Sequence, residues 1–143
     1  MTDIREKLYA LAQKGESAEV EFKSARGGFP GSFWESYSAF ANTNGGTIIL
    51  GVQEKDGKFF FDGLSEETAL KYQKNFWDNA HNRGKVSVCL LRESDVNVVE
   101  MEGAYLLVCY IPRADYSLRP VHLTTNPLGN TYRRNHEGDY LCT

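Results

Sequence analysis

Cysteine is scarce in this sequence of 143 residues, where it occurs only at Cys89, Cys109 and Cys142. The number is odd, and no Cys-x-x-Cys or Cys/His pair has the spacing of a zinc site. Neither a disulfide framework nor a structural zinc site is therefore indicated. A reduced, cytoplasmic setting is the simplest expectation.

Long apolar runs and an excess of positive charge are also missing. No run approaches the roughly 18 residues of a membrane-spanning helix, and segment 1–15 has no apolar core like that of a signal peptide. We therefore expect no membrane partner. The sequence has 16 Lys and Arg and 19 Asp and Glu, so its net charge is −3. This charge argues against a protein that coats nucleic acid through its overall charge, but it is compatible with a local basic patch.

Motifs for nucleotides and for nucleophilic catalysis are absent as well. The 13 glycines form neither Gly-x-x-x-x-Gly-Lys-[Ser/Thr] nor Gly-x-Gly-x-x-Gly. No Ser/His/Asp or Cys/His set stands out by its spacing, and His81 suits the end of a predicted helix, where a cation complements the helix dipole. We therefore expect no cofactor.

The spacing of apolar residues predicts one mixed α/β (α+β) domain over residues 1–143. Helical periodicity predicts about three helices: residues 4–14, a second from a capping box at Ser32 to near Asn44, and a third from Ser65 to near Arg83. Alternation or continuous apolar runs predict strands at 18–23, 47–52, 59–61, 86–91, 96–101, 104–111, 121–124 and 130–134. The helices should pack on a largely antiparallel sheet. Gly51, inside an apolar strand, predicts the close approach of another backbone or of a ligand.

Two charged constellations are candidates for function. Glu16, Glu19, Glu21 and Lys23 lie close together on and before the first strand. Paired carboxylates can hold a divalent ion against a phosphate, with lysine neutralising charge, but a solvated strand face explains the same pattern.

The second constellation is the segment from Arg113 to His136, which contains four arginines and one acid, Asp115. Tyr116 and Tyr132 lie between these charged residues in the sequence. Arginine with exposed aromatics is typical of a surface that follows phosphates and stacks bases, and an ordinary solvated pair of strands is the alternative. Arg133 and Arg134 are adjacent on a strand, so at most one of them can join a given patch.

The motifs taken together resemble a known family. They are similar to motifs of the Schlafen/AlbA-type DNA-binding domain, which occurs in bacterial transcriptional regulators and RecG-related proteins. The motifs in this chain are Glu16-Ser17, Glu21-Phe22-Lys23, the segment Ala39-Phe40-Ala41-Asn42-Thr43-Asn44-Gly45-Gly46, the Gly51-Val52 strand end, Pro120-Val121 and Tyr132-Arg133-Arg134. The resemblance runs from about Glu16 to Tyr140 and implies a nucleic-acid-binding α/β module.

The same resemblance implies an alternative, because animal Schlafens are metal-dependent endoribonucleases. Their paired glutamates correspond to Glu16 and Glu21, which would hold Mg²⁺ or Mn²⁺. A third acid is expected near the end of the glycine-flanked strand, where this chain has Gln53 and then Glu54. The catalytic set would therefore be Glu16, Glu21 and Glu54.

We expect a module that binds nucleic acid, with DNA or RNA as its partner. Its expected role is that of the DNA-binding part of a transcriptional regulator. The residues expected to contact nucleic acid are Lys23, Arg26, Arg119, Tyr132, Arg133 and Arg134. The alternatives are the nuclease and a non-catalytic dimerisation domain. We also expect a homodimer, because animal Schlafens resemble two such modules side by side, and because Phe29, Phe33, Trp34 and Phe59 to Phe61 exceed what one small core readily hides.

Overall fold

A four-stranded sheet forms the centre of the protein, whose computed structural model describes residues 19–56, 58–136 and 138–142. Its strand order is β1-β2-β6-β5, with β1 parallel to β2 and the other neighbours antiparallel. The strands are β1 (Val20–Lys23), β2 (Gly46–Leu50), β5 (Val96–Met101) and β6 (Ala104–Ile111). Two antiparallel hairpins extend from it: β3 (Val52–Lys55) with β4 (Lys58–Phe61), and β7 (Tyr132–Asn135) with β8 (Gly138–Leu141). The mixed, largely antiparallel fold is therefore confirmed.

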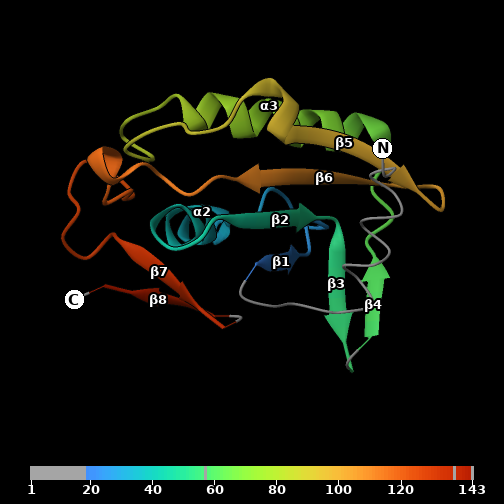
Figure 1. Ribbon diagram of the computed structural model, residues 1–143. Helices are drawn as coiled ribbons and strands as arrows, with labels where there is room; N and C mark the ends of the chain where they lie inside the picture. The colour runs from blue at the N-terminus through green and yellow to red at the C-terminus, as the bar shows by residue number, and fades with distance from the viewer. Residues whose placement is uncertain (1–18, 57, 137, 143) are drawn as a thin grey trace.

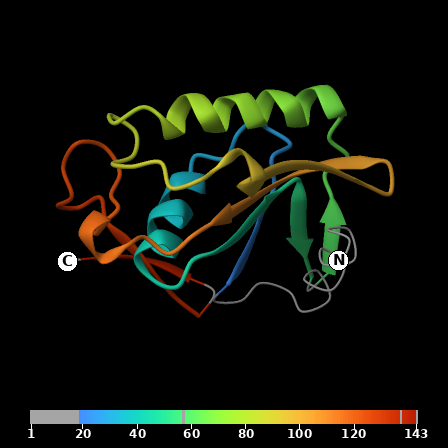
Figure 2. The same cartoon turned by 45° about the horizontal axis from the view of Figure 1, so that its top comes forward.

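The described residues form two α-helices rather than about three. Helix α2 (Phe33–Asn42) and helix α3 (Glu66–Ala80) share one hydrophobic core with one face of the sheet, and α3 runs along β5 and β6 (Figures 1 and 2). The predicted helix at residues 4–14 lies outside the described residues. None of the described helices is long and apolar enough to cross a membrane.

The two predicted helix starts have different outcomes. Ser65 caps α3 by accepting a hydrogen bond from the backbone N–H of Thr68 at 3.2 Å, as its position predicted. Ser32 does not cap α2, so the predicted capping box is wrong there. Its hydroxyl instead accepts a hydrogen bond from Lys23 Nζ at 3.0 Å, because the loop after β1 returns Ser32 to the end of that strand.

Gly51 divides the predicted strand 47–52 into β2 and β3. Its φ of +107° lies in the region that favours glycine, and a Cβ there would stand 3.1 Å from the carbonyl oxygen of Tyr105. The predicted close approach of another backbone is confirmed, but the single continuous strand is wrong. After this corner the β3–β4 hairpin packs Phe59 and Phe61 against a second apolar cluster that includes Phe22, whose ring centroid lies 4.7 Å from that of Phe59.

Two further predicted strands are wrong. Residues 86–91 and 121–124 form only isolated bridges, Val86 with Leu123 and His122 with Thr131. In segment 86–91 the buried side chain of Tyr37 takes the place of a strand partner, because its hydroxyl accepts from Leu90 N at 2.9 Å and donates to Val88 O at 2.8 Å. One phenol thus satisfies backbone groups that a neighbouring strand would otherwise bond. In segment 121–124 the side chains of Ser38 and Asn42 bond the backbone of Val121.

Candidate nucleic-acid interface

The C-terminal hairpin has an inner and an outer face. In its register Arg133 lies opposite Tyr140 and Arg134 lies opposite Asp139. Since side chains alternate along a strand, Arg133 and Tyr140 share one face, and Arg134 and Asp139 share the other. Arg133 is exposed, whereas the side chain of Arg134 is only 1% exposed. The two adjacent arginines therefore have different environments, as the strand geometry predicted.

The inner face is built around the guanidinium of Arg134. Its Nη1 donates to Glu21 Oε2 at 2.8 Å and to Asp139 Oδ1 at 2.9 Å, and its Nη2 donates to the carbonyl of Val20 at 3.2 Å. The same group lies over the ring of Phe40, 4.8 Å from the centroid. Arg134 thus joins β1, α2 and both strands of the hairpin, and in this position it is not accessible to a polymer.

A polar face of α2 fixes the rest of the C-terminal segment. Asn42 Nδ2 donates to the carbonyls of Val121 at 2.8 Å and Tyr132 at 2.9 Å, while its Oδ1 accepts from Val121 N at 2.7 Å. Ser38, one turn earlier and fully buried, donates to Val121 O at 2.7 Å and accepts from Tyr132 N at 3.0 Å. These bonds set the positions of the segment after Pro120 and of β7.

The outer face borders a hollow of about 390 Å³, which we call the basic hollow. Its lining residues are Asn42, Tyr116, Arg119, Pro120, Thr131, Arg133 and Cys142. Two of the arginines predicted to contact nucleic acid, Arg119 and Arg133, are thus brought into one concave site.

Arg119 is held at the basic hollow by its neighbours. Its Nε donates to the carbonyl of Ala114 at 3.0 Å, and its guanidinium carbon lies 5.5 Å from the ring centroid of Tyr116. Asp115 is the nearby acid: a hydrogen bond from the Ser117 hydroxyl, and more weakly the charge of Arg119, lower its pKa. It is therefore ionised at neutral pH and offsets part of the positive charge.

Tyr132 does not share the outer face of Arg133. Its hydroxyl lies 3.4 Å from Glu35 Oε1 on α2, on the same side of the hairpin as Arg134. Burial, and secondarily the charge of Glu35, raise the pKa of this phenol. Tyr132 is therefore a protonated donor to α2 in this structure and does not line the basic hollow.

The candidates near the N-terminus are arranged differently. Glu16 lies outside the described residues, and of Glu54 only the backbone on β3 is described. Glu21 is paired with Arg134 and, at 3.7 Å, with Lys23, whose Nζ also reaches Ser32. Arg26 is exposed in the loop after β1 and is not among the residues that line the basic hollow.

These contacts do not fit a divalent ion at Glu21. Both of its carboxylate oxygens already face cations, one Arg134 and the other Lys23. Asp139 is likewise occupied, because it accepts from Arg134 and, at 2.5 Å, from the hydroxyl of Ser36. Within the described residues, no group of three or more His, Cys, Asp or Glu side chains could hold a metal ion. We therefore derive no reaction step through a metal.

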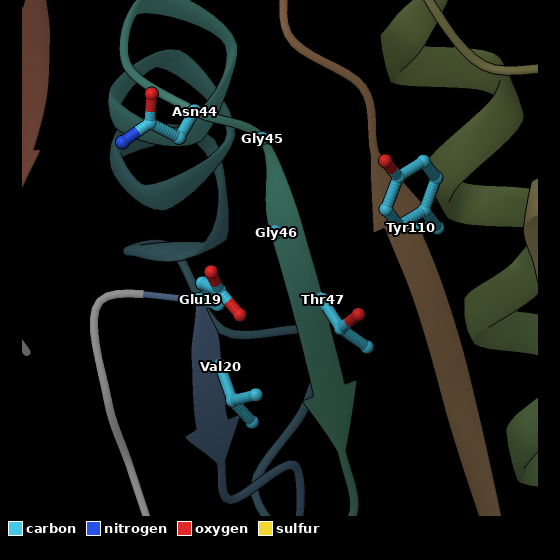
Figure 3. Close-up of a pocket in the computed structure, with 7 residues that line it drawn as sticks. All are labelled: Glu19, Val20, Asn44, Gly45, Gly46, Thr47 and Tyr110. Carbon is cyan, nitrogen blue, oxygen red and sulfur yellow. The ribbon is translucent and has the colours of Figure 1, made fainter. Parts of the chain in front are cut away.

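A second hollow, of about 300 Å³, lies where β1 and β2 begin. The turn Asn44 to Gly46 forms its wall, and Glu19 and Tyr110 lie on opposite sides of the start of β2 (Figure 3). Gly45, at φ +75°, is required there because a Cβ would stand 2.8 Å from the carbonyl oxygen of Ile111. The described residues that line this hollow include no Lys or Arg.

Sequence reasoning missed several residues of the interface. In the sequence Asn42 stands out only as part of the Ala39 to Gly46 motif, although an amide four residues after Ser38 on a mostly apolar helix indicates a polar stripe on one helix face. Asp139 and Tyr140 were missed with β8, because a four-residue strand that contains Gly and Asp has little strand character.

Comparison with known proteins agrees with this architecture. The chain is similar over its whole length to the N-terminal domain of a RecG-related protein from Nitrosomonas europaea, solved by NMR, with 29% identity, a TM-score of 0.68 and 95% of that chain covered. The crystal structure of the DIP2311 protein from Corynebacterium diphtheriae shares the fold over 87% of this chain and 22% of its own, with 19% identity and a TM-score of 0.56. No curated protein matches.

The family model for "Schlafen, AlbA_2" matches residues 16–143, which include every described strand and helix. The earlier resemblance is therefore confirmed. This chain belongs to the Schlafen, AlbA_2 family.

Proposed function

We propose that the protein binds nucleic acid through the basic hollow, as the DNA-binding module of a transcriptional regulator. The observation that carries the proposal is the convergence of Arg119 and Arg133 on one concave surface, with Arg134 turned inward. Guanidinium groups bind phosphate with two parallel hydrogen bonds, which suits them to a nucleic-acid backbone.

The distribution of charge supports the same surface. The segment from residue 54 to residue 67 carries five acids and two lysines. Its β3–β4 hairpin and the start of α3 lie at the opposite end of the molecule from the β7–β8 hairpin in both views (Figures 1 and 2). A polyanion approaching a chain of net negative charge is therefore directed toward the end with Arg119 and Arg133.

Replacing both arginines, Arg119→Ala/Arg133→Ala, should weaken binding about 100-fold, or about 1.4 kcal/mol for each lost contact. The measurement is fluorescence anisotropy with a labelled 20-base strand and its duplex at several salt concentrations. On the duplex, the slope of log K against log salt should fall by about 0.9 for each contact. Parallel samples with Mn²⁺ and with EDTA report any cleavage.

A matched control, Lys71→Ala/Arg92→Ala, removes two exposed cations on the α3 side of the molecule. It should change neither affinity nor slope by more than about twofold, because its charges lie away from the hollow. If both double variants lost the same affinity, binding would depend only on the net charge of the protein, and the proposed site would be refuted. Cleavage that EDTA stops and Glu21→Gln abolishes would replace the binding module with the nuclease.

We further propose that the module works as a homodimer. The exposed aromatic surface that could form a dimer interface is smaller than the sequence predicted. Phe33 and Trp34 are buried in the core, and Phe59 and Phe61 pack against the sheet. Phe60 remains 48% exposed. Light scattering at micromolar concentration should give about twice 16.1 kDa, and Phe60→Ser should lower that mass. A mass of 16.1 kDa at all concentrations would remove the dimer.

A further inference from the structure

We infer that the basic hollow takes single-stranded nucleic acid, with bases stacked on Tyr116 and Tyr140 and phosphates bound by Arg119 and Arg133. The inference deepens the proposed function and rests on it. It is carried by two aromatic side chains that the structure leaves exposed beside the two arginines. Neither tyrosine is needed to explain the fold.

Tyr116 is a lining residue of the hollow and is 83% exposed, far more than a phenol in a packed core. It lies on the short 3₁₀ helix η2 (Tyr116–Leu118), and its ring is near the guanidinium of Arg119. An exposed ring next to a cation can stack on a base while the cation contacts the adjacent phosphate.

Tyr140 repeats this arrangement on the hairpin. It lies directly across from Arg133, on the face that also carries Thr131 and Cys142 of the hollow, and it is 55% exposed. Its ring leans over Gly138, where a Cβ would come within 2.9 Å of it. The missing side chain at Gly138 therefore lets the ring lie close to the strand, which limits its freedom and leaves the rest of it open.

The pairing of each arginine with a tyrosine distinguishes single strands from duplexes. In a duplex the bases are stacked on one another inside the helix, so Tyr116 and Tyr140 would find no exposed base face, and only the arginines would contribute. A single strand can place bases on both rings and phosphates on both arginines. Base stacking on an aromatic side chain contributes about 1–3 kcal/mol per base by alanine substitution.

The experiment compares the wild-type chain with Tyr116→Ala/Tyr140→Ala on four labelled probes: oligo-dT and oligo-rU of 20 bases, and a 20-base-pair DNA with its unpaired strand. The wild type should bind single strands more tightly than the duplex. The double variant should lose at least tenfold on single-stranded DNA, on single-stranded RNA or on both, and less than twofold on the duplex. Its salt slope should remain that of the wild type, because no cation is removed.

Three controls make the result specific. Tyr116→Phe/Tyr140→Phe keeps both rings and should bind like the wild type. Tyr110→Ala removes a tyrosine that is 48% exposed on β6, outside the basic hollow, and should also bind like the wild type. A circular-dichroism melt should show that the alanine variant is folded. Equal losses on duplex and single strand, or a loss in the Phe variant, would overturn the stacking role while leaving binding intact. No binding of any probe by the wild type would instead refute the proposed function.

Discussion

An Arg134→Met variant should lose about 3–5 kcal/mol of unfolding free energy, the largest effect we expect from a single substitution. Methionine keeps the apolar stem but removes the guanidinium that lies between Glu21 and Asp139. Both of those carboxylates are 85% buried, so the change leaves two negative charges without their main partner in a poorly solvated place. Urea unfolding followed by circular dichroism measures the loss, which corresponds to a fall in Tm of about 10 °C.

The neighbouring position gives the matched control. Arg133→Met removes the same group from the exposed face of the same strand and should change stability by less than about 0.5 kcal/mol. Adding Glu21→Gln and Asp139→Asn to Arg134→Met should recover part of the loss, because the two unpaired charges are removed. If Arg134→Met and Arg133→Met proved equally stable, the ion pairs of Arg134 would not be what stabilises the β7–β8 hairpin against the sheet.

An Asn42→Leu variant should lose about 3 kcal/mol and should bind single-stranded DNA roughly fivefold more weakly. Leucine has a similar size but cannot bond Val121 or Tyr132, so the N–H of Val121 loses its acceptor and two carbonyls lose a donor. Each buried polar group left without a partner costs about 1–3 kcal/mol. Affinity falls as well, because the same bonds hold the segments that carry Arg119 and Arg133.

Stability is measured by urea unfolding, and affinity is measured well below the unfolding transition so that all molecules are folded. Asn44→Ala changes an exposed asparagine two residues later and should remain within about 0.5 kcal/mol of the wild type. A stability loss in Asn42→Leu without any loss of affinity would show that Asn42 supports the fold but not the position of the arginines.

Local patterns predicted the parts of the fold that local forces decide. Alternation and a Glu102-Gly103 turn gave strands 96–101 and 104–111 with the bounds that β5 and β6 have. The alternation of side chains along a strand also predicted that Arg133 and Arg134 lie on opposite faces, and the register of β7 with β8 confirms this. These features depend on residues close to one another in the chain.

The errors concern interactions between distant residues. The predicted strand at 86–91 ignored Tyr37, which bonds that segment from 51 positions away. Arg134 was grouped with the binding arginines because its partners, Glu21 and Asp139, cannot be identified from spacing within one strand. Tyr116 and Tyr140 could be recognised as an exposed pair only after the register of β7 with β8 and the place of η2 were known.

The bond between Arg134 and Glu21 joins residues 113 positions apart, and that between Ser36 and Asp139 joins residues 103 apart. Closing loops of that length costs chain entropy that is recovered only when the contacts are complete, so we expect such contacts to form late in folding. During synthesis the sheet strands β1, β2, β5 and β6 all precede Arg134, so Glu21 gains this partner only after all four strands have been made. We therefore expect the face of the hairpin that carries Arg133 and Tyr140 to be fixed in place only after the central sheet has formed.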